Sequence, residues 1–90
     1  MEIKIMNKSK SELENLNVYS WPIWEKEKSK FSWEYTEKEQ CYILKGRAII
    51  KPKNKDKKVT IKKGDFVEFP EGMKCTWEIL EDVKKHYTLG

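Results

Sequence analysis

The segment that decides the fold is Gly64-Asp-Phe-Val-Glu-Phe-Pro-Glu-Gly-Met-Lys-Cys-Thr-Trp-Glu-Ile79. It predicts a short strand over 66–69 and a turn at 70–72, followed directly by another strand. Side chains alternate between the two faces of a strand, so every second residue from position 75 shares one face. The residues expected on the inner face are Cys75, Trp77 and Ile79.

Upstream segments have the same character. In Phe31-Ser-Trp-Glu-Tyr35 the rings alternate with polar residues, so we expect all three rings to point inward. The strand expected over 39–44 is apolar on both faces, which predicts either a second covering layer or a subunit partner on its outer face. Gly46 interrupts this strand and is expected to form a bulge or tight bend.

The remaining elements complete an all-β chain with one short helix. Lys53-Asn-Lys-Asp56 is the expected tip of a hairpin that returns through 58–62, and the last strand is expected over 83–88. Near the N-terminus, Ser11-x-x-Glu14 fits a capping box and predicts a helix near 9–16. Ninety residues suit a single domain over 1–90, divided into an N-terminal strand and helix over 1–20 and a barrel over 21–90.

Two spacings connect this pattern with a known family. Glu39 precedes Gly46 by seven positions, and Gly64, Pro70 and Gly72 follow the order glycine, five residues, proline, one residue, glycine. The chain therefore resembles the cupin superfamily, in particular the small single-barrel members of the (S)-ureidoglycine aminohydrolase cupin domain family. The resemblance implies a cupin (RmlC-like) jelly-roll β-barrel with its site inside the barrel.

The departures from the cupin motifs bear on metal binding. The three motif histidines would fall at Trp33, Tyr35 and Cys75, so all three are replaced. The asparagine that often closes the second motif is Ile79 here. Of the implied metal ligands only Glu39 remains, and Cys75 could join it. We therefore leave the cofactor open: a divalent metal held by this pair is possible, and the absence of a tightly bound metal is the favoured expectation.

Glu39 is the first candidate for chemistry. A carboxylate inside a ring-lined barrel must be paired, bound to a metal, or protonated, unless it lies in water at the barrel mouth. Cys75 could act as a metal ligand or as a nucleophile with Glu39 as proton acceptor, or it could be a small core residue. Cys41 is expected in the core, close enough to Cys75 for the two thiols to be redox-sensitive.

Aromatic residues complete the expected pocket. Trp33, Tyr35 and Trp77 would line it together with Glu39, Cys41 and Cys75, although packing alone could explain the rings. His86, the single histidine, is expected at an exposed or interface position. The apolar segment 21–24 predicts a dimer seam or a lid over the sheet, with a ligand-binding role as the alternative.

Three functions remain open. The leading hypothesis is a homodimeric cupin that binds a small molecule in this pocket. The first alternative is a metal-dependent enzyme, similar to the aminohydrolases, that acts on a ureido or amide compound; whether the protein is an enzyme is left open. The second alternative is a basic interaction module that uses the lysines of 51–63.

Charge and composition argue against some of these classes. The net charge of +4 comes almost wholly from lysine, and the run at 51–63 contains no aromatic residue and no arginine, so we interpret it as a solvated hairpin with a guarded edge. Nucleic acid is therefore not an expected partner. The first residues contain no apolar stretch long enough for a signal peptide or membrane span, and two cysteines are too few for a disulfide scaffold. We expect a cytoplasmic protein without a membrane partner.

Overall fold

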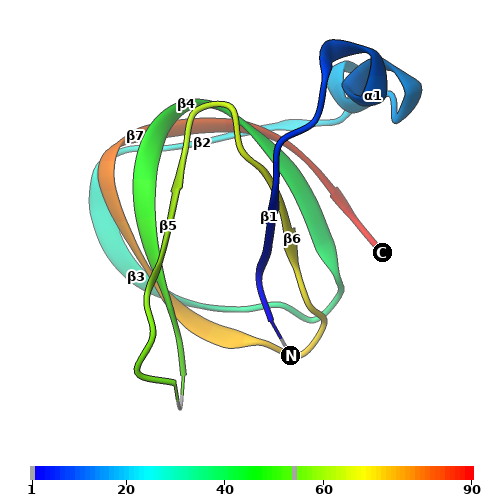
Figure 1. The fold of residues 1–90 in the computed structure, drawn as a ribbon. Helices are drawn as coiled ribbons and strands as arrows, with labels where there is room; N and C mark the ends of the chain where they lie inside the picture. The colour runs from blue at the N-terminus through cyan, green and yellow to red at the C-terminus, as the bar shows by residue number, and fades with distance from the viewer. Residues whose placement is uncertain (1, 54) are drawn as a thin grey trace.

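The computed structural model describes residues 2–53 and 55–90, which form an antiparallel β-barrel with one short α-helix (Figure 1). The elements follow the chain in the order β1 (Lys4–Met6), α1 (Lys10–Asn15), the 3-10 turn η1 (Val18–Ser20), β2 (Ile23–Lys26), β3 (Ser29–Glu34), β4 (Glu39–Pro52), β5 (Val59–Lys62), β6 (Phe66–Phe69) and β7 (Lys74–Leu89). The predicted all-β class with one short helix is confirmed.

Two long strands organise the sheet. The strand order is β1-β6-β4-β7-β2, while β3 also pairs with β7 and β5 also pairs with β4. The predicted strands over 75–79 and 83–88 are therefore one continuous strand, β7, because it pairs along its whole length with β4. The β4–β5 hairpin is present as predicted. Its expected tip at 53–56 includes Asn54, which lies outside the described residues.

Gly46 forms the predicted bulge, and its conformation explains how β4 stays half inside the barrel. The register between β4 and β7 shifts around this residue. Before the bulge the odd-numbered Cys41 and Ile43 are buried, and after it the even-numbered Ala48 and Ile50 are buried. Gly46 has φ +91°, and a Cβ there would lie 2.2 Å from the carbonyl oxygen of Asp82, so only glycine fits.

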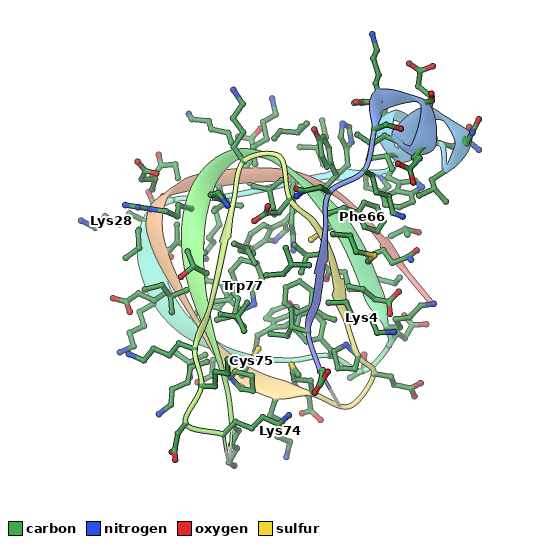
Figure 2. All side chains as sticks on the ribbon, viewed as in Figure 1. Lys4, Lys28, Phe66, Lys74, Cys75 and Trp77 are labelled. Atoms are coloured by element: carbon green, nitrogen blue, oxygen red, sulfur yellow. The ribbon has the colours of Figure 1, made fainter. Side chains whose placement is uncertain are left out.

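The barrel interior is filled mainly by inward residues of β4 and β7, among them Cys41, Ile50, Trp77 and Ile79. In Figure 2 Trp77 lies within the ring of strands, whereas Lys74 points away from it. Alternation in the first part of β7 keeps the odd-numbered residues of 75–79 inside, as the sequence predicted, and it is interrupted at the exposed Glu81.

The N-terminal segment forms the second layer predicted over the outer face of β4. Leu13, Val18 and Phe66 are buried together there, and Tyr42 packs against them. Figure 1 shows α1 outside the ring of strands, while β1 pairs with β6 and so belongs to the sheet.

The helix cap differs from the prediction. The capping box is formed by Ser9 and Glu12, whose side chains bond each other's backbone N–H, and not by Ser11 and Glu14. Both pairs fit the same sequence pattern, and the earlier one is selected because the helix must begin early enough to place Leu13 against Phe66. No helix in the described residues is long and apolar enough to cross a membrane.

Candidate functional site

A cavity of about 230 Å³ lies among the start of β4, the second half of β7, and strands β2 and β3. Its walls are mainly aromatic, and its rim contains residues exposed to solvent, including Trp33, Glu34 and Glu37. The lining residues are Trp24, Phe31, Trp33, Glu34, Tyr35, Thr36, Glu37, Glu39, Trp77, Lys85, Tyr87 and Leu89. An apolar hollow with a few convergent polar groups is the usual form of a small-molecule site.

A buried ion pair belongs to this cavity. The Nζ atom of Lys85 donates a hydrogen bond of 2.6 Å to Oε2 of Glu39, and both side chains are less than a tenth exposed. Glu39 is thus paired, one of the states that the sequence left open for it. A carboxylate and an ammonium group taken out of water together need close contact and further favourable neighbours to compensate for lost hydration.

Aromatic rings supply those neighbours. Nζ of Lys85 lies 4.7 Å from the ring centroid of Trp24 and 4.8 Å from that of Trp77, with Phe69 at 5.9 Å. The faces of aromatic rings carry negative potential and attract cations within about 6 Å. The Lys85 ammonium group is therefore held by one carboxylate and by indole rings.

Tyr35 connects the ion pair to the aromatic core. Its hydroxyl oxygen accepts a hydrogen bond of 3.1 Å from Nε1 of Trp77, and its ring stacks on Phe69 with centroids 4.6 Å apart. Burial raises the pKa of Tyr35 well above its usual value, and the nearby Glu39 carboxylate raises it further. Tyr35 is therefore a neutral hydroxyl at the cavity wall.

The structure brings together four of the six predicted pocket residues. Trp33, Tyr35, Glu39 and Trp77 all line the cavity. The inward orientation predicted for the Trp33 ring is wrong, since Trp33 is 49% exposed. The indole stands at the rim near the end of β3, edge-on to Phe31 with centroids 6.5 Å apart.

The two cysteines are not among the residues that line the cavity. Cys41 is fully buried, and burial raises the pKa of its thiol to about 12. Cys75 is also buried, and burial followed by the Glu39 charge raises its pKa to about 11. Cys75 borders a separate open groove with Lys51 and Pro52. A raised pKa means a protonated thiol at neutral pH, which is a poor nucleophile and a poor metal ligand.

Of the two positions expected for His86, exposed or at an interface, the exposed one is wrong. Its side chain is 7% exposed, and Nδ1 lies 2.9 Å from the carbonyl oxygen of Trp21. The N-terminal layer causes the difference, because Tyr19 packs edge-on against the imidazole with centroids 5.9 Å apart. Of the apolar segment 21–24, the Trp24 ring reaches the cavity while Ile23 is half exposed.

The residues present do not fit the metal that the cupin motifs imply. Trp33 and Tyr35 occupy two of the three histidine positions, and Glu39 is bonded to a lysine ammonium group at 2.6 Å. The Lys85 ammonium group occupies the Glu39 carboxylate and repels a metal cation that would bind to that same group. Among the described residues no group of three His, Cys, Asp or Glu side chains converges to hold one.

Lys85 is the site residue that the sequence interpretation missed. A signal for it existed: the odd-numbered positions buried at Cys75, Trp77 and Ile79 are buried again at 83 and 85, after a break at position 81. A lysine at an inward position of a strand needs a carboxylate partner, and Glu39 is the inward acidic residue of β4.

Comparison with known proteins gives a consistent result. A family described as the EutQ-like cupin domain matches residues 13–87. A solved structure of a DUF861 family protein from Thermotoga maritima has 47% sequence identity and a TM-score of 0.96, covering 99% of this chain and 100% of that one. No curated protein is significantly similar to the chain.

More distant structures share the fold alone. The EutQ protein of Clostridium difficile has 21% identity and a TM-score of 0.66, with 74% of this chain and 52% of that chain covered, so the chain spans about half its length. A cupin superfamily protein of Desulfitobacterium hafniense has 17% identity and a TM-score of 0.57, with 98% of this chain and 77% of that chain covered.

Proposed function

The chain belongs to the EutQ-like cupin domain family, and from this premise we propose that it binds a small organic molecule in the aromatic cavity beside Lys85 and Glu39. The observation that carries the proposal is the buried ion pair at a cavity with an open rim. The cavity is smaller than the ~300–1,000 Å³ of typical ligand pockets, so the ligand is correspondingly small.

Exposed apolar residues support the proposal. Trp33 and Leu89 are each about half exposed, and both line the cavity. Large apolar side chains that cluster at a hollow reduce solubility without adding to the core, and they commonly mark a binding surface. A ligand that enters the cavity would cover both side chains.

The ion pair gives the second line of support. Replacing a buried pair by apolar residues of similar volume is often neutral or stabilising, so stability alone does not explain the pair. Lys85 and Glu39 offer a donor and an acceptor at one place, which is what orients a small polar ligand within apolar walls.

The test is a screen of small amines, alcohols and carboxylic acids by ¹H–¹⁵N NMR on the full chain, followed by affinity measurements on Trp33→Ala. Trp33 is largely in water, so this variant should fold normally while binding falls about three- to tenfold through loss of one ring contact.

Leu16→Ala is the matched control, because Leu16 is 41% exposed and does not line the cavity. Its affinity should stay within about twofold of the natural protein. Shifts scattered over the surface, or an equal loss of affinity in both variants, would contradict the proposal.

The aminohydrolase alternative is less well supported. Its chemistry depends on a metal that polarises a carbonyl or generates hydroxide, and Lys85 beside Glu39 disfavours that metal. Ammonia release from a ureido or amide compound at a rate that falls in Glu39→Gln would revive it. The basic-module alternative has only the exposed lysines near β5, an edge strand that charges protect from pairing.

Assembly and location also remain proposals. We propose a homodimer that covers the exposed Tyr19 and Ile23, and a cytoplasmic location in which both thiols stay reduced. Light scattering on the natural protein and on Ile23→Asp, which should be monomeric, tests the dimer.

A further inference from the structure

We propose that the ligand of this cavity is a small organic cation, either a protonated amine or a quaternary ammonium compound, whose charge is held at the rim by Trp33 and Glu37. The inference rests on the proposed function and names the class of ligand for the same site. Three features of the cavity carry it: the way it holds Lys85, the residues at its rim, and the sign of its charge.

The inner part of the cavity already holds one alkylammonium ion, which belongs to the protein itself. Nζ of Lys85 lies over the rings of Trp24 and Trp77, at 4.7 Å and 4.8 Å from their centroids, and donates to the Glu39 carboxylate. Two indoles and a carboxylate are the elements with which proteins recognise ammonium ligands. The surroundings of Lys85 therefore show that these walls are suited to a cation.

The rim contains the same elements, an indole ring and carboxylates. The Trp33 indole is half exposed and stands edge-on to Phe31, which itself stacks on Trp77. Glu34 and Glu37 line the same cavity, and both are exposed. A cation that enters the cavity would meet a ring face and carboxylates before it reaches the ion pair.

The charge of the lining points the same way. The lining residues include three carboxylates, Glu34, Glu37 and Glu39, and one ammonium group, Lys85, so their formal sum is −2. The whole chain carries +4. A negatively charged hollow on an otherwise positively charged protein attracts cations and raises their local concentration.

An anionic ligand fits less well. It would have to pass the rim carboxylates and then displace Glu39 from Lys85, whose bond of 2.6 Å is buried. The rings of Trp24 and Trp77 would repel the incoming anion at the same time.

The two rim carboxylates should not contribute equally. Lys74 stands opposite Glu34 in the register of β3 and β7, so part of the negative charge of Glu34 is offset. Glu37 follows the end of β3 and so lies outside the ladder between β3 and β7. We therefore expect Glu37 to dominate recognition of the cation.

Three probes of similar shape test the inference on the full chain: phenethylammonium, 2-phenylethanol and 3-phenylpropionate, each titrated while the NMR signals of the Trp33 and Trp77 indoles are followed. Phenethylammonium should bind about tenfold more tightly than the neutral alcohol, through one ring contact and one exposed ion pair. The difference should shrink at high salt, because rim charges are screened.

The variant Glu37→Gln should remove most of the preference for the cation over the alcohol, and Glu14→Gln, an exposed change on α1, should leave it unchanged. Equal affinity for the cation and the alcohol, or tighter binding of the carboxylate, overturns the cation class but leaves small-molecule binding intact. If none of the three probes shifts either indole signal, both the cation class and the proposed function fail.

Discussion

The two halves of β7 follow the same alternation but bury different chemistry. In the first half the inward residues Cys75, Trp77 and Ile79 are apolar or weakly polar and fill the barrel. In the second half Lys85 points inward and is bonded to Glu39, while the next residue, His86, is buried on the outer face under the N-terminal layer. One strand thus supplies the core at one end and a polar site at the other.

The difference between the two halves of β7 separates residues that stabilise the barrel from residues that form the site. Apolar burial gains free energy in proportion to area, about 25 cal/mol per Å², so the first half stabilises the barrel directly. The second half buries charge, which costs free energy unless each charge is paired. Stability therefore does not explain why the second half of β7 buries a charged residue, and a functional role is the remaining explanation.

The largest effect should come from breaking the pair in the charged half. Lys85→Ala leaves the Glu39 carboxylate buried without its partner, so the free energy of unfolding should fall by about 3–5 kcal/mol. Urea unfolding at neutral pH measures it. The double variant Lys85→Met with Glu39→Gln should lose less than Lys85→Ala alone, because no uncompensated charge remains.

Glu81→Ala provides the surface control. It removes an exposed ion pair with Arg47, so the change should be below about 1 kcal/mol. A loss in Lys85→Ala no greater than that in Glu81→Ala would mean that the two halves of β7 do not differ energetically.

A smaller effect is expected at the junction of the halves, where Gly46 of β4 presses against Asp82. Gly46→Ala places a Cβ 2.2 Å from the Asp82 carbonyl oxygen at φ +91°, so β7 must move, at a cost of about 3 kcal/mol. Gly64→Ala has a similar φ of +93° but open space around it, and should cost only about 1–2 kcal/mol. Thermal or urea unfolding of the two variants compares them; equal losses would exclude a role for the contact with Asp82.

The smallest effect concerns the thiol in the apolar half. Burial raises the pKa of Cys75 to about 11 from 9.0, so the folded state holds this proton more tightly than the unfolded state. The resulting stability is complete below pH 9 and is lost as the pH rises toward 11. The urea midpoint should therefore fall less steeply above pH 9 in Cys75→Ala than in the natural protein.

The same shift predicts slow alkylation of the folded protein. The rise of the Cys75 pKa from 9.0 to about 11 lowers its thiolate fraction at pH 8 on the order of 100-fold. Iodoacetamide labelling followed by mass spectrometry should therefore show slower alkylation of Cys75 than of a free cysteine. Labelling at the rate of free cysteine would show that the thiol is not held in an apolar site.

The fold could be predicted because its signals are local. The alternation at 75–79, the turn at Pro70, and the positions of Glu39 and Gly46 each depend on a few neighbouring residues, and the structure confirms the strands, the bulge and the covering layer over β4. The burial of Glu39 could also be expected, since alternation places it on the same face of β4 as Cys41 and Ile43.

The rest depended on contacts between distant segments. Lys85 is 46 positions from Glu39, and its inward direction could be seen only by treating 75–89 as one strand. His86 seemed free to face water because the sequence does not show that Tyr19 returns to cover it. Trp33 lies close to the end of β3, where its ring is exposed. The alternation of apolar and polar residues does not show where a strand ends.

The pairing of β4 with β7 has a consequence for how the chain reaches this state. Their register joins Glu39 to Leu89 and Pro52 to Cys75, so most of the ladder links positions far apart along the chain. Such non-local topologies fold slowly, over about milliseconds to seconds, because loop-closure entropy is lost before the contacts form. Glu39 and Lys85 can meet only after this ladder has closed, so the chain acquires its cavity late in folding and a nascent or partly unfolded chain has none.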